Sequence, residues 1–284
     1  MTICNNENDT YHNILLTISI LLDQKKQISE DEICSILSFE DLSKLRKCLT
    51  RWKELEFFKY NNNKLEFSEH VKPIIESNKS KITKILPTII RKVVFFEKNN
   101  NNFWDSDANK SSDFTRGVAW MLSQDIYKFD FSNPEMQRLS TEQTKKDIIN
   151  NTNSIAGLKS WSSFLGFVCE TPFKIIDPTQ AILEEIEFSF SKQEYSIQQF
   201  LSKLTESIPV LDHGKYRKKV EEHLNPKVWG KPKEKILSTS ISRAFIRLQE
   251  LNVLRLIKKD DAGEDFRTLQ LLRSEKEITH IKVL

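Results

Sequence analysis

Leu49-x-x-Trp52-x-x-Leu55-x-Phe57 is one of three stretches in which an apolar stripe runs from a helix into a β-type segment. The other two are Leu158-x-x-Trp161-x-x-Phe164-x-x-Phe167 and Phe245-x-x-Leu248-x-x-Leu251-x-Val253. This spacing buries one face of a helix, and a turn followed by a second β-type segment completes a hairpin. A helix that leads into a hairpin is typical of the second half of a winged-helix module. The sequence therefore predicts a mainly α fold with small β wings, organised as tandem winged-helix-like modules joined by helical linkers.

The first module is the clearest of the three. We expect helices over 11–24 and 29–37, the second opened by a capping box in which Ser29 pairs with Glu32. Glu40 and Asp41 then place acids in the first turn of a third helix. A hairpin with an Asn-rich tip follows over about 57–67. This arrangement predicts that Trp52 is buried.

The rest of the chain divides into a central and a C-terminal part. In the central part we predict a linking helix over 79–98, a flexible polar segment over 99–112, helices over 113–124, 141–151 and from 154, a small wing over 167–176, and a helix over 178–187 capped by Asp177. In the last part we predict helices over 196–207, 214–224 and about 232–251, a wing over 254–272 that turns at Gly263, and an edge strand over 277–284. The predicted domains are 1–76, 77–192, the latter possibly holding a second such module, and 193–284.

Composition narrows the functional class. The 284 residues are 38% hydrophobic and 29% charged, with six glycines, which disfavours a large β-sandwich or a Gly-rich nucleotide loop. The four cysteines are scattered without a C-x-x-C pair, which indicates a reduced, cytoplasmic protein. The apolar run over 14–22 is too short to span a bilayer and lacks the flanks of a signal peptide. We therefore expect no membrane association.

Enzyme signatures are missing. The sequence has no Gly-rich phosphate loop, no H-E-x-x-H and no G-x-S-x-G, and its histidines are isolated. We expect no catalytic residue, no cofactor and no bound metal.

Basic residues point to nucleic acid. On the third helix of the first module, Lys44, Lys47 and Arg51 lie opposite the apolar stripe, as in a recognition helix. Between Leu201 and Lys259 there are 14 Lys and Arg residues against six acids. The candidates there are Lys215, Arg217, Lys218, Lys219, Arg243, Arg247, Lys258 and Lys259. The sequence favours the last module as the stronger nucleic-acid candidate, and an ordinary solvated face of lysine and arginine is the alternative.

Four stretches carry a resemblance to a known family. They are Thr115–Asp125, Trp161 with Phe164–Phe167, Ile175–Ile182 and Pro209–Arg217. Together they resemble the DpdG proteins, which are encoded in bacterial islands that insert deazapurine bases into DNA and restrict DNA lacking them. The chain departs from the family at His213, where that pattern has a second glycine. The resemblance implies an accessory, restriction-associated component and supplies no active-site residue.

These observations predict a non-enzymatic protein that binds double-stranded DNA within a multi-protein bacterial defence system. Its protein partners would be helicase- or ATPase-type components of the same island. A protein-interaction scaffold is the first alternative, because winged helices also pair with proteins through the same helix and wing. A transcriptional regulator is the second.

Overall fold

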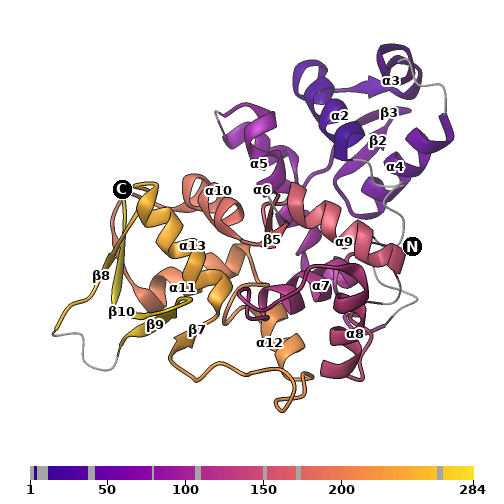
Figure 1. Ribbon diagram of the computed structural model, residues 1–284. Helices are drawn as coiled ribbons and strands as arrows, with labels where there is room; N and C mark the ends of the chain where they lie inside the picture. Colours follow the sequence, from indigo (N-terminus) through magenta and orange to yellow (C-terminus); the bar gives the residue numbers. More distant parts are fainter. Residues whose placement is uncertain are drawn as a thin grey trace.

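The computed structural model describes residues 3–4, 12–37, 42–78, 80–105, 110–149, 152–170, 174–260 and 265–284. It is about half helical, with small sheets that are mainly antiparallel (Figure 1). The expectation of a mainly α fold with small β elements is therefore confirmed.

The N-terminal part, indigo in Figure 1, runs helix, strand, helix, helix, hairpin. Its elements are α2 (His12–Lys25), β1 (Ile28–Ser29), α3 (Glu30–Leu37), α4 (Leu42–Glu54), β2 (Phe58–Asn61) and β3 (Lys64–Phe67). β3 is the central strand and pairs antiparallel with β1 and β2. The expected hairpin and the Ser29–Glu32 capping box are both confirmed, with the Glu32 N–H donating to Ser29 Oγ at 3.2 Å. Glu40 and Asp41 lie outside the described residues.

The central part consists of helices and one two-stranded hairpin. Its elements are α5 (Lys72–Ser77), α6 (Ile82–Val94), the 3₁₀ turn η1 (Glu97–Asn99), α7 (Ser112–Leu122), α8 (Asn133–Gln143), α9 (Thr152–Phe164), β4 (Val168–Cys169) and β5 (Ile175–Ile176). β4 pairs antiparallel with β5, which confirms a small hairpin within the expected range of 167–176. The tip of this wing, residues 171–173, lies outside the described residues.

Two expectations for the central part are wrong. The helix predicted over 141–151 ends at Gln143, because Pro134 starts α8 at Asn133 and the chain leaves the helix at Thr144. The flexible segment predicted over 99–112 does not begin at Asn99, although Asn101, Asn102 and Asp105 are exposed and residues 106–109 lie outside the described residues. Asn99 and Asn100 are buried, and their side-chain amides donate to the carbonyls of Val93 and Val94 at the end of α6, at 2.9 and 2.8 Å. Both asparagines therefore act as C-terminal caps of α6.

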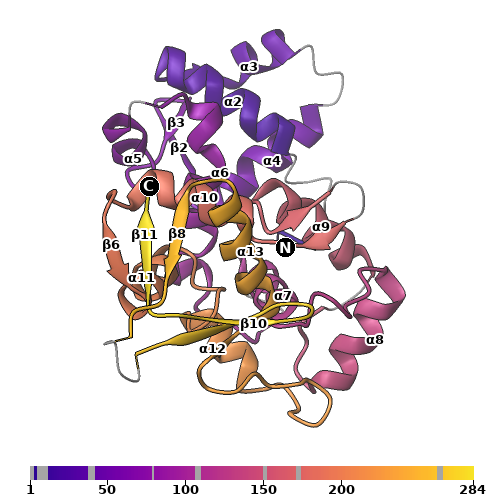
Figure 2. The ribbon, with the colours of Figure 1, turned by 60° about the vertical axis from the view of Figure 1, so that its left-hand side comes forward.

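The C-terminal part contains the larger share of the strands. Its elements are α10 (Thr179–Ser189), β6 (Glu194–Ser196), α11 (Ile197–Ser207), α12 (Lys215–Glu221), β7 (Ile236–Leu237), α13 (Thr239–Glu250), β8 (Leu254–Ile257), β9 (Arg267–Gln270), β10 (Glu275–Ile278) and β11 (His280–Val283). They form two three-stranded sheets, in the orders β6-β11-β8 and β10-β9-β7. Figure 2 shows β6, β11 and β8 side by side, with β10 crossing below them.

The prediction that the two strands of 254–272 pair with each other as a wing is wrong. β8 pairs with β11, while β9 pairs with β10 and β7, so the two predicted wing strands belong to different sheets. The predicted edge strand near the C-terminus is instead β11, the centre of its sheet. The third helix begins at Thr239 and not near residue 232, because Ser238 caps it. Gly263 lies outside the described residues.

One order of elements occurs twice in the chain. The series α10, β6, α11, α13, β8, β11 repeats the helix–strand–helix–helix–strand–strand order of α2, β1, α3, α4, β2, β3. The sheet orders β6-β11-β8 and β1-β3-β2 also correspond strand by strand. In the second occurrence α12 and β7 are inserted before the third helix, and β9 and β10 are inserted between the last two strands. The C-terminal repeat therefore starts at α10, earlier than the sequence pattern indicates.

The three apolar stripes end their helices in the same way. Glu56, Gly166 and Asn252 follow α4, α9 and α13 with left-handed φ values of 62°, 78° and 57°. The next residue in each case donates its N–H back to a carbonyl five residues earlier, namely Phe57 to Trp52, Phe167 to Ser162 and Val253 to Leu248, at 2.8 to 2.9 Å. This is the hydrogen bond of a Schellman cap, which reverses the chain into a strand. Trp52, Trp161 and Leu248 are buried as expected, and the Trp52 and Trp161 rings lie 5.3 Å apart.

Gly166 is the glycine that this cap requires most. Its φ is +78°, and a Cβ there would lie 2.7 Å from the backbone nitrogen of Ala181. We expect Gly166→Ala to lower the free energy of unfolding by about 2 kcal/mol or more, from the left-handed backbone and the close approach together. Gly230→Ala is the matched control, because nothing lies within 4 Å of its added Cβ. Urea unfolding of both variants checks this, and equal midpoints would contradict it.

Candidate nucleic-acid interface

The outward face of α4 carries most of its positive charge. The apolar stripe of Leu45, Leu49 and Trp52 is buried, which turns the intervening positions toward solvent. Lys44 and Lys47 are both exposed on this face, where the sequence places them. Two further exposed cations on α4, which we did not predict, extend the face: Arg46 and Lys53. Arg46 and Lys53 lie seven residues apart, on one side of the helix, and that spacing is the signal that could have found them.

Arg51 does not belong to this face. Its side chain is only 8% exposed and contacts Glu54, with 2.7 Å between Nη1 and Oε2. The expectation that Arg51 points outward with Lys44 and Lys47 is wrong, because its side chain is buried and pairs with Glu54. We call the four exposed cations Lys44, Arg46, Lys47 and Lys53 the α4 face.

The candidates on α12 divide into exposed and buried side chains. Lys218 and Lys219 are exposed, and Lys219 Nζ lies 5.3 Å from the ring centroid of Phe103. Lys215 is exposed but pairs with Glu97 at 3.3 Å. Arg217 is buried, so its predicted exposure is wrong.

The Arg217 guanidinium is part of a buried polar junction. It lies 3.5 Å from Asp212 and donates to Glu221. Asp212 in turn accepts the N–H of Ser238 at 2.6 Å and its hydroxyl at 2.7 Å. Arg217 therefore neutralises the carboxylate that holds the start of α13, which is a structural role.

Arg243 and Arg247 are turned onto the central hairpin. Both guanidinium groups contact Asp177, whose side chain is fully buried, while the arginine side chains are 35% and 38% exposed. Burial disfavours the charge on Arg247, but Asp177 outweighs it and raises the pKa of Arg247. α13 therefore directs these arginines to a buried carboxylate, and nucleic-acid binding by Arg243 and Arg247 stays a prediction.

The two lysines after β8 are also paired. Lys258 lies 2.7 Å from Glu277, and Lys259 contacts Glu194. Both remain exposed, and an exposed ion pair is worth at most about 1 kcal/mol. A phosphate could compete with either carboxylate.

The structure does not gather the predicted cations on one surface. α4 lies in the upper part of the molecule and α12 in the lower part in both Figure 1 and Figure 2. Of the three helices that end in the same cap, α4 keeps four cations exposed, although Arg46 Nε lies 3.6 Å from Glu30 Oε2. α13 directs Arg243 and Arg247 to Asp177, and α9 directs Lys159 to the Phe131 carbonyl and Asn133.

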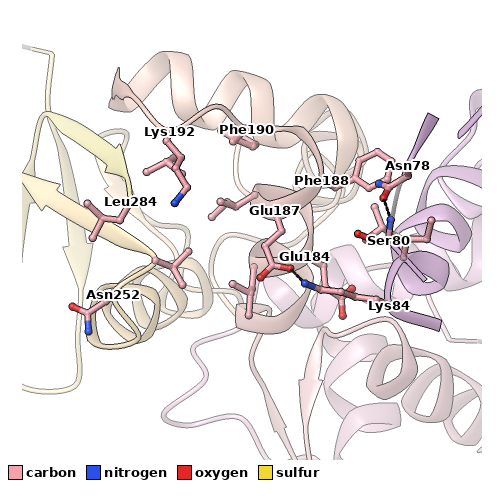
Figure 3. Close-up of a pocket in the computed structure, with 16 residues that line it drawn as sticks. Asn78, Ser80, Lys84, Glu184, Glu187, Phe188, Phe190, Lys192, Asn252 and Leu284 are labelled. Carbon is pink, nitrogen blue, oxygen red and sulfur yellow. Dashed lines mark hydrogen bonds and ion pairs between the residues drawn. The ribbon is translucent and has the colours of Figure 1, made fainter. Parts of the chain in front are cut away.

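A pocket of about 420 Å³ lies between α6, α10 and the end of β11 (Figure 3). Its apolar wall includes Ile85, Leu183 and Val283. Two charged side chains at its rim form an ion pair, with 2.9 Å between Lys84 Nζ and Glu187 Oε2. The pocket therefore combines an apolar wall with ion-paired charges at its rim.

Neither a metal site nor a membrane span is evident in the described parts of the chain. Among those residues no group of three His, Cys, Asp or Glu side chains could hold a metal ion. None of the helices described is both long and apolar enough to cross a bilayer.

The sequence was compared with models of known protein families. A family model described as DpdG-like matches residues 1–262. The chain belongs to the DpdG-like family. Membership of the DpdG-like family associates it with bacterial deazapurine DNA modification. No curated protein and no solved structure matches it.

The stretches that carry the DpdG resemblance have structural roles here. α7, which holds most of Thr115–Asp125, is buried along its whole length. His213 adopts a left-handed φ of 68°, the conformation that a glycine would adopt most easily. The next residue, Gly214, packs so tightly that a Cβ would lie 2.3 Å from the Pro209 carbonyl oxygen. Thr115–Asp125 and Pro209–Arg217 therefore lie at the junction of α7, α12 and α13.

Proposed function

We propose that this chain is a non-enzymatic, duplex DNA-binding component of a bacterial deazapurine DNA modification and restriction system. In this proposal residues 12–67 form a winged-helix module, and the α4 face enters the major groove. The protein would act in the cytoplasm with helicase- or ATPase-type components of the same system. The observation that carries the proposal is the exposure of Lys44, Arg46, Lys47 and Lys53 on the helix before the β2–β3 hairpin.

The topology supports the winged-helix assignment. A winged helix has a short strand after its first helix, a helix pair, and a hairpin whose second strand lies between the other two. The order of α2, β1, α3, α4, β2 and β3, with β3 central, meets this description. In helix-turn-helix proteins the second helix of the pair lies in the major groove, which is about 12 Å wide. α4 occupies that position, and lysine and arginine on it would contact phosphates and base edges.

The repeat that starts at α10 is a second winged-helix module in this proposal, but one whose helix is covered. Arg243 and Arg247 of α13 hold Asp177 and so face the chain itself. The module would position the α4 face and not bind DNA itself. The local charge balance favours the last module as the DNA-binding one, whereas this proposal assigns DNA binding to the first.

Hydrogen–deuterium exchange on the full-length protein tests the location. On addition of a duplex of about 20 base pairs at low salt, we expect reduced exchange in α4 and in the β2–β3 hairpin. α13 should not change, because its arginines are already in contact with Asp177. Protection confined to α12 or α13 would place the DNA elsewhere and contradict the proposal.

A scaffold role in the same system is the second candidate. It is favoured by the pocket of Figure 3, where an apolar wall meets a rim of paired charges. Co-purification with other components of the system, together with no affinity for duplex DNA at low salt, would support the scaffold role.

A further inference from the structure

A second polar pocket, of about 550 Å³, lies where the N-terminal and central parts meet. α9 forms one wall with Lys159, Ser160 and Ser163, and Lys174, directly before β5, forms another. His12, Asn133, Ala156, Phe164 and Glu170 complete the lining. The donors in this pocket are the ones that proteins use for oxyanions: ammonium groups, hydroxyls and an amide.

The two lysines are held in place by neighbouring acceptors. Lys159 Nζ donates to the Phe131 carbonyl and to Asn133 Oδ1, the latter at 2.5 Å, which occupies two of its three protons. Lys174 Nζ lies 3.2 Å from Glu170 Oε1, and Ser163 Oγ donates to the same carboxylate at 2.5 Å. Glu170 is therefore shared and balances one of the two lysines.

The positive charge of this pocket exceeds what its acids balance. Burial lowers the pKa of Lys159, and the charge of Lys174 lowers it further, while Asp130 only partly opposes these effects. A bound anion between Lys159 and Lys174 would relieve this repulsion. The lining of the pocket thus carries two ammonium groups and one carboxylate.

The pocket also has a planar apolar edge. The imidazole of His12 stacks on the Phe164 ring with centroids 5.1 Å apart and planes 9° apart. Flat rings beside an anion site suit a ligand in which a phosphate is joined to a base. The space is also larger than inorganic phosphate needs.

We propose that this pocket binds the phosphate monoester of a nucleotide, through Lys159, Lys174 and Ser160. The phosphate comes either from a free nucleoside monophosphate or from the 5′ end of a DNA strand. This inference goes beyond the duplex-binding proposal, because it concerns α9 and β5 and not the α4 face.

Calorimetric titration of the full-length protein tests the site with a deoxynucleoside 5′-monophosphate and the matching nucleoside. We expect the monophosphate to bind at least about tenfold more tightly than the nucleoside, because charged hydrogen bonds to phosphate are the stronger ones. Lys174→Gln should weaken monophosphate binding by about tenfold, and Ser160→Ala by less. Lys128→Gln, an exposed lysine paired with Asp125 elsewhere on the surface, should leave it unchanged.

A second arm separates the two sources of phosphate. A short single strand carrying a 5′-phosphate is compared with the same strand carrying a 5′-hydroxyl. A preference for the phosphorylated strand that Lys174→Gln removes assigns the site to DNA ends, whereas binding of the free monophosphate alone assigns it to nucleotides. No binding of any phosphate monoester, or binding that Lys174→Gln and Ser160→Ala leave unchanged, overturns the inference. Variants of the α4 face should not alter monophosphate binding, so the two proposals can fail independently.

Discussion

Replacing Arg243 and Arg247 together by glutamate should lower the free energy of unfolding by about 3 kcal/mol or more. The substitution leaves Asp177, which is fully buried, without its cationic partners and places two further carboxylates beside it. Removing one partner of a buried ion pair costs about 3–5 kcal/mol, because the remaining charge cannot be solvated. Asp177 also accepts the N–H of Thr179 at 3.0 Å, so the start of α10 should be disturbed as well.

Denaturant unfolding followed by circular dichroism measures this effect. Lys258→Glu with Lys259→Glu is the charge-matched control, because those lysines form exposed pairs whose loss should cost about 1 kcal/mol or less each. Adding Asp177→Asn to the Arg243→Glu, Arg247→Glu protein should recover part of the loss by removing the buried repulsion. If the Arg243→Glu, Arg247→Glu protein unfolds at the wild-type midpoint and loses only DNA affinity, α13 is the DNA-binding helix.

The helix ends are the feature that sequence predicts best. A stripe of large apolar residues that leads into a strand requires the chain to reverse at the end of the helix, and Glu56, Gly166 and Asn252 all do so with a left-handed backbone. The central stripe is displaced by one residue. Its cap uses the carbonyl of Ser162 and not that of Trp161. The spacing of apolar residues identifies the buried stripe, but it does not determine which carbonyl accepts the capping hydrogen bond.

Strand pairing is predicted less well where partners are distant in sequence. The β2–β3 and β4–β5 hairpins join neighbouring strands, and both agree with expectation. β8 and β9 have equally good strand patterns, but β8 pairs with β11 across the β9–β10 insertion. The periodicity of a strand predicts which of its faces is buried, but it does not predict which strand it pairs with.

The ion pairs of α13 and β8 are hidden from the sequence for a related reason. Helical spacing places Arg243 and Arg247 opposite the apolar stripe, but it cannot show what packs on that side. Their partner Asp177 is 70 residues from Arg247 in sequence, and Lys259 pairs with Glu194 across 65 residues. Local charge counts therefore overestimate the positive surface of the last part of the chain.

Charge reversal on the α4 face should have the largest effect on DNA affinity. Lys44→Glu with Lys47→Glu removes two expected phosphate contacts and adds two repulsive charges. Both side chains are exposed, and glutamate at position 44, in the first turn of α4, is favoured by the helix dipole, so the fold should be retained. Each phosphate contact contributes about −0.9 to the slope of log affinity against log salt, so the slope should become shallower by roughly 1.8.

The most direct measurement is fluorescence anisotropy of full-length protein with a labelled duplex, from about 50 to 200 mM salt. We expect wild-type affinity to fall steeply with salt, and the Lys44→Glu, Lys47→Glu protein to bind more than tenfold more weakly at the lowest salt. Lys231→Glu with Lys233→Glu reverses the same number of exposed charges in the C-terminal part and should bind within a few-fold of wild type. Loss of affinity in the control equal to that in the α4 variant, or wild-type binding that does not change with salt, would contradict DNA binding through α4.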